Sequence, residues 1–176
     1  MKLLLARTLG GVVFALVATG VSAQQSTNRV AAKTDWSVFV ESNPTECWAV
    51  SSPKKTVNTK DGRPVAVRRS DILLFVSYRP GSNVKGEISF TGGYGFKAGS
   101  TVSMEIDGKK YDLFTDGEWA WPATGGDDSK IMTAMKRGSS AVLKGVSGRS
   151  GTVTTDTFSL LGFTAAVEEA EKRCGG

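Results

Sequence analysis

Histidine is absent from the 176-residue sequence, and cysteine occurs only twice. Without histidine the chain cannot form a Ser-His-Asp triad or a Cys-His pair, the usual arrangements for nucleophilic catalysis. The two cysteines, Cys47 and Cys174, are far apart in the sequence and make a poor ligand set for zinc or iron. We therefore expect no metal site and no cofactor, and the leading hypothesis is a protein that is not an enzyme.

Long hydrophobic runs are also missing, except at the N-terminus. Lys2 and Arg7 are followed by the apolar run 10–20 and by a small-residue cleavage pattern at 21–23. This order is typical of a secretory signal peptide over residues 1–23. A membrane-spanning helix needs ~20 apolar residues, so the run is too short to span, and no later stretch is long enough. We expect a periplasmic or secreted protein with no membrane span after signal cleavage.

The chain has no large excess of charge of either sign. Its formal net charge is +5, and loss of Lys2 and Arg7 with the signal peptide would leave +3. That charge is too small for a dedicated nucleic-acid binder, so no nucleic-acid partner is expected. The remaining chain has the length of one domain and can bury a single core.

Strand periodicity dominates the sequence from Asp35 onward. Residues 24–34 are polar and aperiodic, which predicts a flexible leader. Trp36, Val38 and Val40 then alternate with other residues, as in a strand with one buried face. Asp-Gly pairs at 61–62, 107–108 and 116–117 are turn signals. The continuous apolar run within 71–79 suggests a strand buried on both faces.

Two segments have helical spacing instead. Ile131, Met132 and Met135 form a short stripe, with Asp128 or Ser129 as the expected N-cap. A second stripe runs to the C-terminus, with Thr164 as its expected cap and Gly175 as its expected αL end. Its members are Phe163, Ala166, Val167, Ala170 and Cys174. Residues 35–176 are therefore predicted to form a mainly β, single-domain antiparallel β-sandwich or barrel with a mid-chain and a C-terminal helix.

The two cysteines allow a single disulfide. Export would permit oxidation, and a Cys47–Cys174 bridge would clamp the C-terminal helix onto an early strand. A pair of reactive thiols is the alternative, although the sequence contains no C-x-x-C motif.

The C-terminal string TTDTFSLLGFTAAVEEAEKRC resembles the signature of the invasion-associated locus B family of bacterial exported proteins. The matching residues are Phe158, Ser159, Leu160, Gly162, Phe163, Thr164, Ala165, Ala166, Arg173 and Cys174. DWSVFV with the following Cys47 resembles the family's N-terminal motif, and GSTVSMEIDGK resembles its central hairpin. The resemblance covers about 35–174. It implies a link to host-cell invasion in pathogenic members, and it carries over no catalytic residue.

Basic residues are concentrated between Pro53 and Lys85. Arg63, Arg68 and Arg79 are candidate contacts for an anionic envelope glycan or a host-surface component, because clustered positive charge attracts anions. The alternative is a solvated strand face whose edge lysines discourage sheet pairing. Because Arg68 and Arg69 are adjacent, they should face opposite sides of a strand, with one of them available for a buried ion pair.

Aromatic residues supply the second candidate surface. Trp119 and Trp121 share a face if their segment is extended, and exposed aromatic rings can stack on sugars or anchor a partner. The glycine-rich stretch 90–100 adds further aromatic residues. The alternative is that these rings pack in the core and in turns.

Two acidic motifs complete the candidates. Asp116 and Glu118 are two residues apart and would serve a carboxylate-dependent hydrolase if both turned into one pocket. Asp127 and Asp128 would suit a calcium or phosphate loop, but capping of the following helix explains them more simply. We take a binding protein as the leading hypothesis, with the hydrolase and a purely structural or stress-related envelope protein as alternatives.

Overall fold

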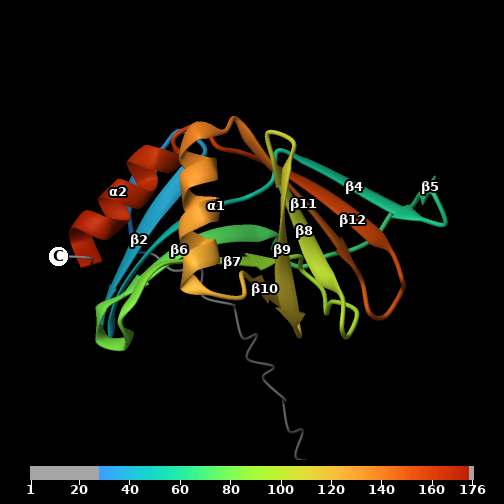
Figure 1. The fold of residues 1–176 in the computed structure, drawn as a ribbon, viewed down its shortest axis with the longest axis horizontal. Helices are drawn as coiled ribbons and strands as arrows, with labels where there is room; N and C mark the ends of the chain where they lie inside the picture. Colours follow the sequence, from blue (N-terminus) through green and yellow to red (C-terminus); the bar gives the residue numbers. More distant parts are fainter. Residues whose placement is uncertain (1–27, 175–176) are drawn as a thin grey trace, which may run out of the picture.

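A computed structural model describes residues 28–174 (Figure 1). The predicted signal peptide at 1–23, the first part of the predicted leader and Gly175 lie outside the described residues. Within them, no helix is long and apolar enough to cross a membrane.

Twelve strands form one antiparallel sheet in the order β1-β2-β3-β6-β7-β10-β9-β8-β11-β12-β4-β5. Their bounds are β1 Arg29–Lys33, β2 Trp36–Ser42, β3 Thr45–Ser51, β4 Lys55–Lys60, β5 Arg63–Pro64, β6 Leu73–Arg79, β7 Val84–Thr91, β8 Thr101–Ile106, β9 Lys109–Asp116, β10 Trp119–Trp121, β11 Ser140–Val146 and β12 Val153–Ser159. A 3₁₀ turn, η1 (Pro80–Ser82), joins β6 to β7. Two of the predicted Asp-Gly turns, at 61–62 and 107–108, have both residues at positive φ.

The predicted fold class is confirmed, with one refinement of the architecture. The protein is mainly antiparallel β and carries a mid-chain and a C-terminal helix. Instead of two stacked sheets or a closed barrel, its strands make one open sheet with β1 and β5 at the edges. The sheet curls so far that Phe90 on β7 meets Phe158 on β12, with ring centroids 6.1 Å apart.

The prediction of a flexible leader at 24–34 is wrong for residues 29–33. Arg29–Lys33 form β1, which pairs with β2 through an irregular register between Arg29 and Ala31. The small residues Ala31 and Ala32 give this segment no alternating pattern. It becomes a strand because the edge of β2 offers unpaired backbone groups for it to bond.

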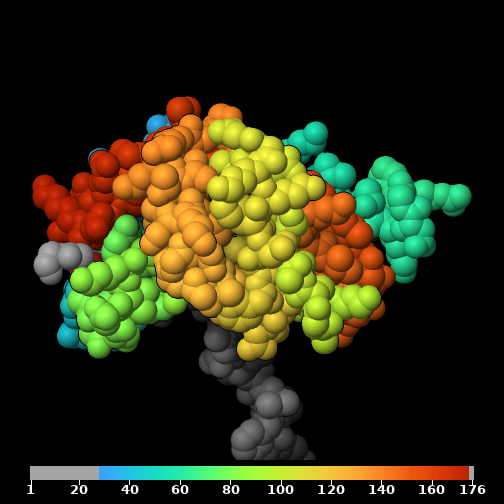
Figure 2. Space-filling view, viewed as in Figure 1, coloured from blue at the N-terminus to red at the C-terminus, as the bar shows by residue number. Residues whose placement is uncertain are grey.

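Helix α2 (Phe163–Cys174) covers one face of the sheet, beside β2 and β3 (Figures 1 and 2). All five residues of the predicted stripe are buried, and Cys174 forms the predicted disulfide with Cys47 of β3. Thr164 lies inside the helix instead of capping it. Gly162 precedes the helix at φ 89°, and a Cβ there would collide with the carbonyl of Lys33. Only glycine therefore fits the approach to α2.

Helix α1 (Gly125–Arg137) lies against β7. Its N-cap is Thr124, whose hydroxyl accepts the Asp127 N–H, and not Asp128 or Ser129 as predicted. The Asp128 carboxylate instead accepts the Ile88 N–H at 2.8 Å. Strand β10 pairs with β7 only at Phe90 and Thr91. The N–H of Ile88 lies outside this pairing, and helix α1 supplies its acceptor.

The sheet interior near β12 contains a buried ion pair. The guanidinium of Arg69 makes two hydrogen bonds to the carboxylate of Asp156, at 2.8 and 2.6 Å, and a third to the carbonyl of Gly92 at 2.7 Å. The side chains of Arg69 and Asp156 are 5% and 0% exposed. Arg68 is exposed, so the two residues have different surroundings as predicted, although they lie between β5 and β6 and not on a strand.

An aromatic groove as the candidate functional site

The strands present two different faces. On β3, Cys47 and Ala49 are buried on the side of α2, and Glu46 and Trp48 alternate with them. Because successive side chains of a strand point to opposite faces, Glu46 and Trp48 lie on the face away from α2. We call these the covered face and the open face.

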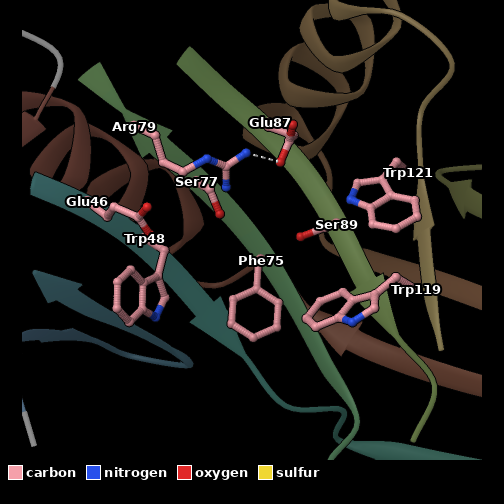
Figure 3. Close-up of a pocket in the computed structure, with 9 residues that line it drawn as sticks. All are labelled: Glu46, Trp48, Phe75, Ser77, Arg79, Glu87, Ser89, Trp119 and Trp121. Atoms are coloured by element: carbon pink, nitrogen blue, oxygen red, sulfur yellow. Dashed lines mark hydrogen bonds and ion pairs between the residues drawn. The ribbon is translucent and has the colours of Figure 1, made fainter. Parts of the chain in front are cut away.

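A groove of about 620 Å³ crosses the open face (Figure 3). Strands β3, β6, β7 and β10 contribute its lining. The lining residues are Glu46, Trp48, Phe75, Ser77, Arg79, Glu87, Ser89, Trp119 and Trp121. Its volume lies within the range of about 300–1,000 Å³ that is usual for ligand sites.

The groove is hollow because small residues lie between large ones. Ser77 on β6 stands opposite Trp48 on β3, and Ser89 on β7 stands opposite Phe75 on β6. Tryptophans on the outer strands β3 and β10 rise beside these serines and form the two walls (Figure 3). The wall strands are three strand spacings apart, about 14 Å.

Aromatic rings continue across the open face. Trp119 lies 5.7 Å from Phe75 and 6.4 Å from Trp121, measured between ring centroids. Trp121 in turn lies 5.5 Å from Phe114 of β9. At the other side of the groove, Phe39 of β2 stacks on Trp48 with an interplanar angle of 8°. The groove is thus the middle of an aromatic band that extends from β2 to β9.

Charged residues close one end of the groove. Arg79 donates to Glu87 at 2.6 Å across neighbouring strands, and both side chains are about one-third exposed. Glu46 stands beside them from β3 (Figure 3). One guanidinium therefore faces two carboxylates, and the groove carries no excess of positive charge.

The structure divides the predicted binding residues into two groups. Arg79, Trp119 and Trp121 come together in the groove. Arg63 is exposed on β5, at the sheet edge beyond β12, where the β4–β5 hairpin projects from the molecule (Figures 1 and 2). Arg68 is exposed in the segment between β5 and β6 and does not line the groove. Arg79 therefore does not share a surface with Arg63, because β6 and β5 hold distant positions in the sheet.

Sequence reasoning missed Trp48, Phe75 and the two serines. The strand that holds Phe75 was expected to be buried on both faces, but only Leu74, Val76 and Tyr78 are fully covered. The polar residue Ser77 within this apolar run was the one signal that a face is open.

The four acidic candidate residues lie at the β9–β10 turn and at the start of helix α1. Asp116 and Glu118 are exposed at the β9–β10 turn, and neither lines the groove. The Lys130 ammonium and the Thr124 hydroxyl lower the pKa of Asp127, whereas burial raises that of Asp128. In the described part of the chain, no three histidine, cysteine, aspartate or glutamate side chains gather in a way that could hold a metal ion.

Comparison with known proteins identifies relatives of the fold. The structure is similar to the crystal structure of invasion-associated protein B from Bartonella henselae, with a TM-score of 0.52, 15% identity, and coverage of 81% of this chain and 95% of that one. No curated protein sequence matches the chain significantly. The family model described as invasion associated locus B (IalB) protein matches residues 36–171. The chain therefore belongs to the invasion-associated locus B family.

Proposed function

We propose that this protein acts outside the cytoplasm by binding an envelope or host-surface component in the aromatic groove, without catalysing a reaction. The observation that carries the proposal is the open tryptophan cluster. Trp119 is 39% exposed and Trp121 and Trp48 are half-buried, although the covered face has an apolar core. Aromatic rings left in solvent beside polar groups are typical of recognition surfaces.

Two further observations support an extracytoplasmic role. The Cys47–Cys174 disulfide is of the kind that persists in oxidising compartments. The family and its Bartonella member are described as invasion-associated, which fits a protein that meets a surface. The exposed positions of Asp116 and Glu118 give the carboxylate-dependent hydrolase no concave site, so binding is the better-supported function.

The test is binding of the labelled protein to envelope preparations and to host cells. We expect Trp119→Ala/Trp121→Ala to abolish binding and Arg63→Ala/Arg68→Ala to preserve it, because only the first pair lines the groove. Mass spectrometry of the recovered component should find it chemically unchanged. Full binding by the tryptophan variant would contradict the site, and a cleaved or modified component would contradict the non-enzymatic role.

A further inference from the structure

We infer that the groove takes an uncharged saccharide chain, laid across β3, β6, β7 and β10 with its sugar rings against the tryptophans. This inference rests on the proposed function, since it names the chemical class of ligand for the same groove. Three properties of the lining support it, namely the shape of the aromatic surface, the unpartnered hydrogen-bonding groups and the charge.

The aromatic surface is partly exposed, since Trp119 is 39% exposed and Trp121 is half-buried. Trp119 and Trp121 are nearly parallel, with an interplanar angle of 22°. Sugar rings present one or both faces as C–H groups, which pack against the electron-rich face of an indole while the hydroxyls point outward. An open groove lined by two such rings and by Trp48 on the opposite wall suits a chain of rings better than a single compact molecule (Figure 3).

Ser89 is the strongest polar indicator. It is only 7% exposed and lines the groove between Phe75 and Trp121 (Figure 3). Its hydroxyl makes no hydrogen bond to any residue that the structure describes, and neither does the hydroxyl of Ser77. These hydroxyls are open to solvent in the groove. A ligand that displaces their water must offer them new partners, and a ligand rich in hydroxyl groups would supply them.

The indole N–H groups of the groove tryptophans, like the two serine hydroxyls, make no hydrogen bond within the described chain. Trp36, in the core, donates its Nε1–H to the carbonyl of Ser159 at 3.0 Å. The three groove tryptophans have no corresponding acceptor among residues 28–174. Indole donors, serine hydroxyls and the Glu46 carboxylate together offer both donors and acceptors. A purely apolar ligand would leave these groups unsatisfied.

The charge of the lining selects against anionic sugars. Arg79 is already neutralised by Glu87, and Glu46 adds a carboxylate with no ion-pair partner among the described residues. A phosphorylated or uronate-containing chain would meet this carboxylate, and like charges in a partly desolvated site repel. The expected anionic glycan would therefore have to contact the exposed arginines outside the groove, Arg63 and Arg68.

The experiment is titration calorimetry of the purified protein with oligosaccharides of defined chemistry. Maltohexaose, cellohexaose and N-acetylchitohexaose represent neutral chains, and hexagalacturonate represents an anionic one. A proline-rich peptide represents the other class of ligand that docks on aromatic grooves. We expect at least one neutral chain to bind, with an affinity nearly independent of salt, and hexagalacturonate to bind at least tenfold more weakly.

Variants then place the saccharide in the groove. Trp119→Ala should weaken binding about tenfold, Trp119→Phe much less, and Ser89→Ala about three- to tenfold. Arg63→Ala/Arg68→Ala is the matched control outside the groove and should leave the affinity unchanged. Circular dichroism and thermal unfolding must first show that each variant is folded.

The outcomes separate this inference from the proposed function. Binding of the peptide or the anionic chain in preference to every neutral chain would overturn the saccharide inference. So would the absence of binding to all neutral chains. In either case the proposed function would stand if Trp119→Ala/Trp121→Ala still abolished surface binding. It would fall if that variant bound surfaces normally.

Discussion

On the covered face of the sheet, Trp36 packs edge-on against Phe163 at 4.9 Å and its indole N–H is hydrogen-bonded. On the open face, Trp119 is 39% exposed and its indole has no acceptor in the described chain. The same residue type thus has opposite surroundings on the two faces. The covered face therefore stabilises the fold, whereas the open face leaves aromatic side chains partly exposed, as the proposed binding function requires.

The largest effect on stability should come from the buried ion pair. Arg69→Met would leave the fully buried Asp156 without its charge partner, and such a loss costs about 3–5 kcal/mol. Urea unfolding measures it. The double variant Arg69→Met/Asp156→Leu should recover much of the loss, because it removes both charges. If the single variant is as stable as the wild type, this part of the covered face does not stabilise the fold as described.

Loss of the disulfide should have the next largest effect. The Cys47–Cys174 bridge joins residues 127 positions apart, and a long loop gives a large entropic stabilisation in the chain-entropy model. We expect Cys47→Ala/Cys174→Ala to lower the free energy of unfolding by about 2–4 kcal/mol while the circular dichroism spectrum stays β-rich. An unchanged melting temperature would mean that the bridge contributes nothing.

A pH-dependent effect should arise at Tyr78, which is buried on the covered face. Burial, together with the charge of Glu171, raises the pKa of Tyr78 to about 12. The folded state therefore holds the phenolic proton more tightly than the unfolded state. Tyr78 should cause stability to fall as the pH rises from about 10 to 12. Tyr78→Phe should show a shallower fall over this range in parallel urea titrations. Equal slopes for the two proteins would argue against a buried phenol.

The smallest effect is expected at the β4–β5 hairpin and the segment after it. Arg63 and Arg68 are exposed, so Arg63→Ala/Arg68→Ala should change the free energy of unfolding by less than about 0.5 kcal/mol. If these arginines contact an anionic glycan, the variant should lose only the salt-sensitive part of surface binding. A loss of salt-insensitive binding would show that the hairpin and the groove act together.

Much of the covered face could be predicted from local patterns in the sequence. The stripe of α2 repeats at helical spacing, and the Asp-Gly turns act through their own backbone conformation. The disulfide followed from the cysteine count. The helix and the turns are indicated by residues that are close together in the sequence, and two cysteines allow only one disulfide.

The groove could not be predicted in the same way because it depends on strand order. Trp48 and Trp121 become opposite walls only when β10 pairs with β7 and β3 pairs with β6. Ser89 can be recognised as a groove residue only from its neighbours across the sheet, such as Phe75. Trp119 and Trp121 were found because they share a face within one strand. Likewise, β1 was missed because its pairing with β2, and not its own sequence, makes it a strand.

The most direct test of the difference between a stabilising covered face and a binding open face uses the variant Trp119→Ala. Stability and binding are measured on the same samples. Urea unfolding gives the first quantity, and binding of the labelled protein to envelope preparations and host cells gives the second. We predict a free energy of unfolding within about 1 kcal/mol of the wild type, because the side chain is partly exposed, together with loss of most surface binding. A variant that unfolds much more easily yet binds normally would contradict the account.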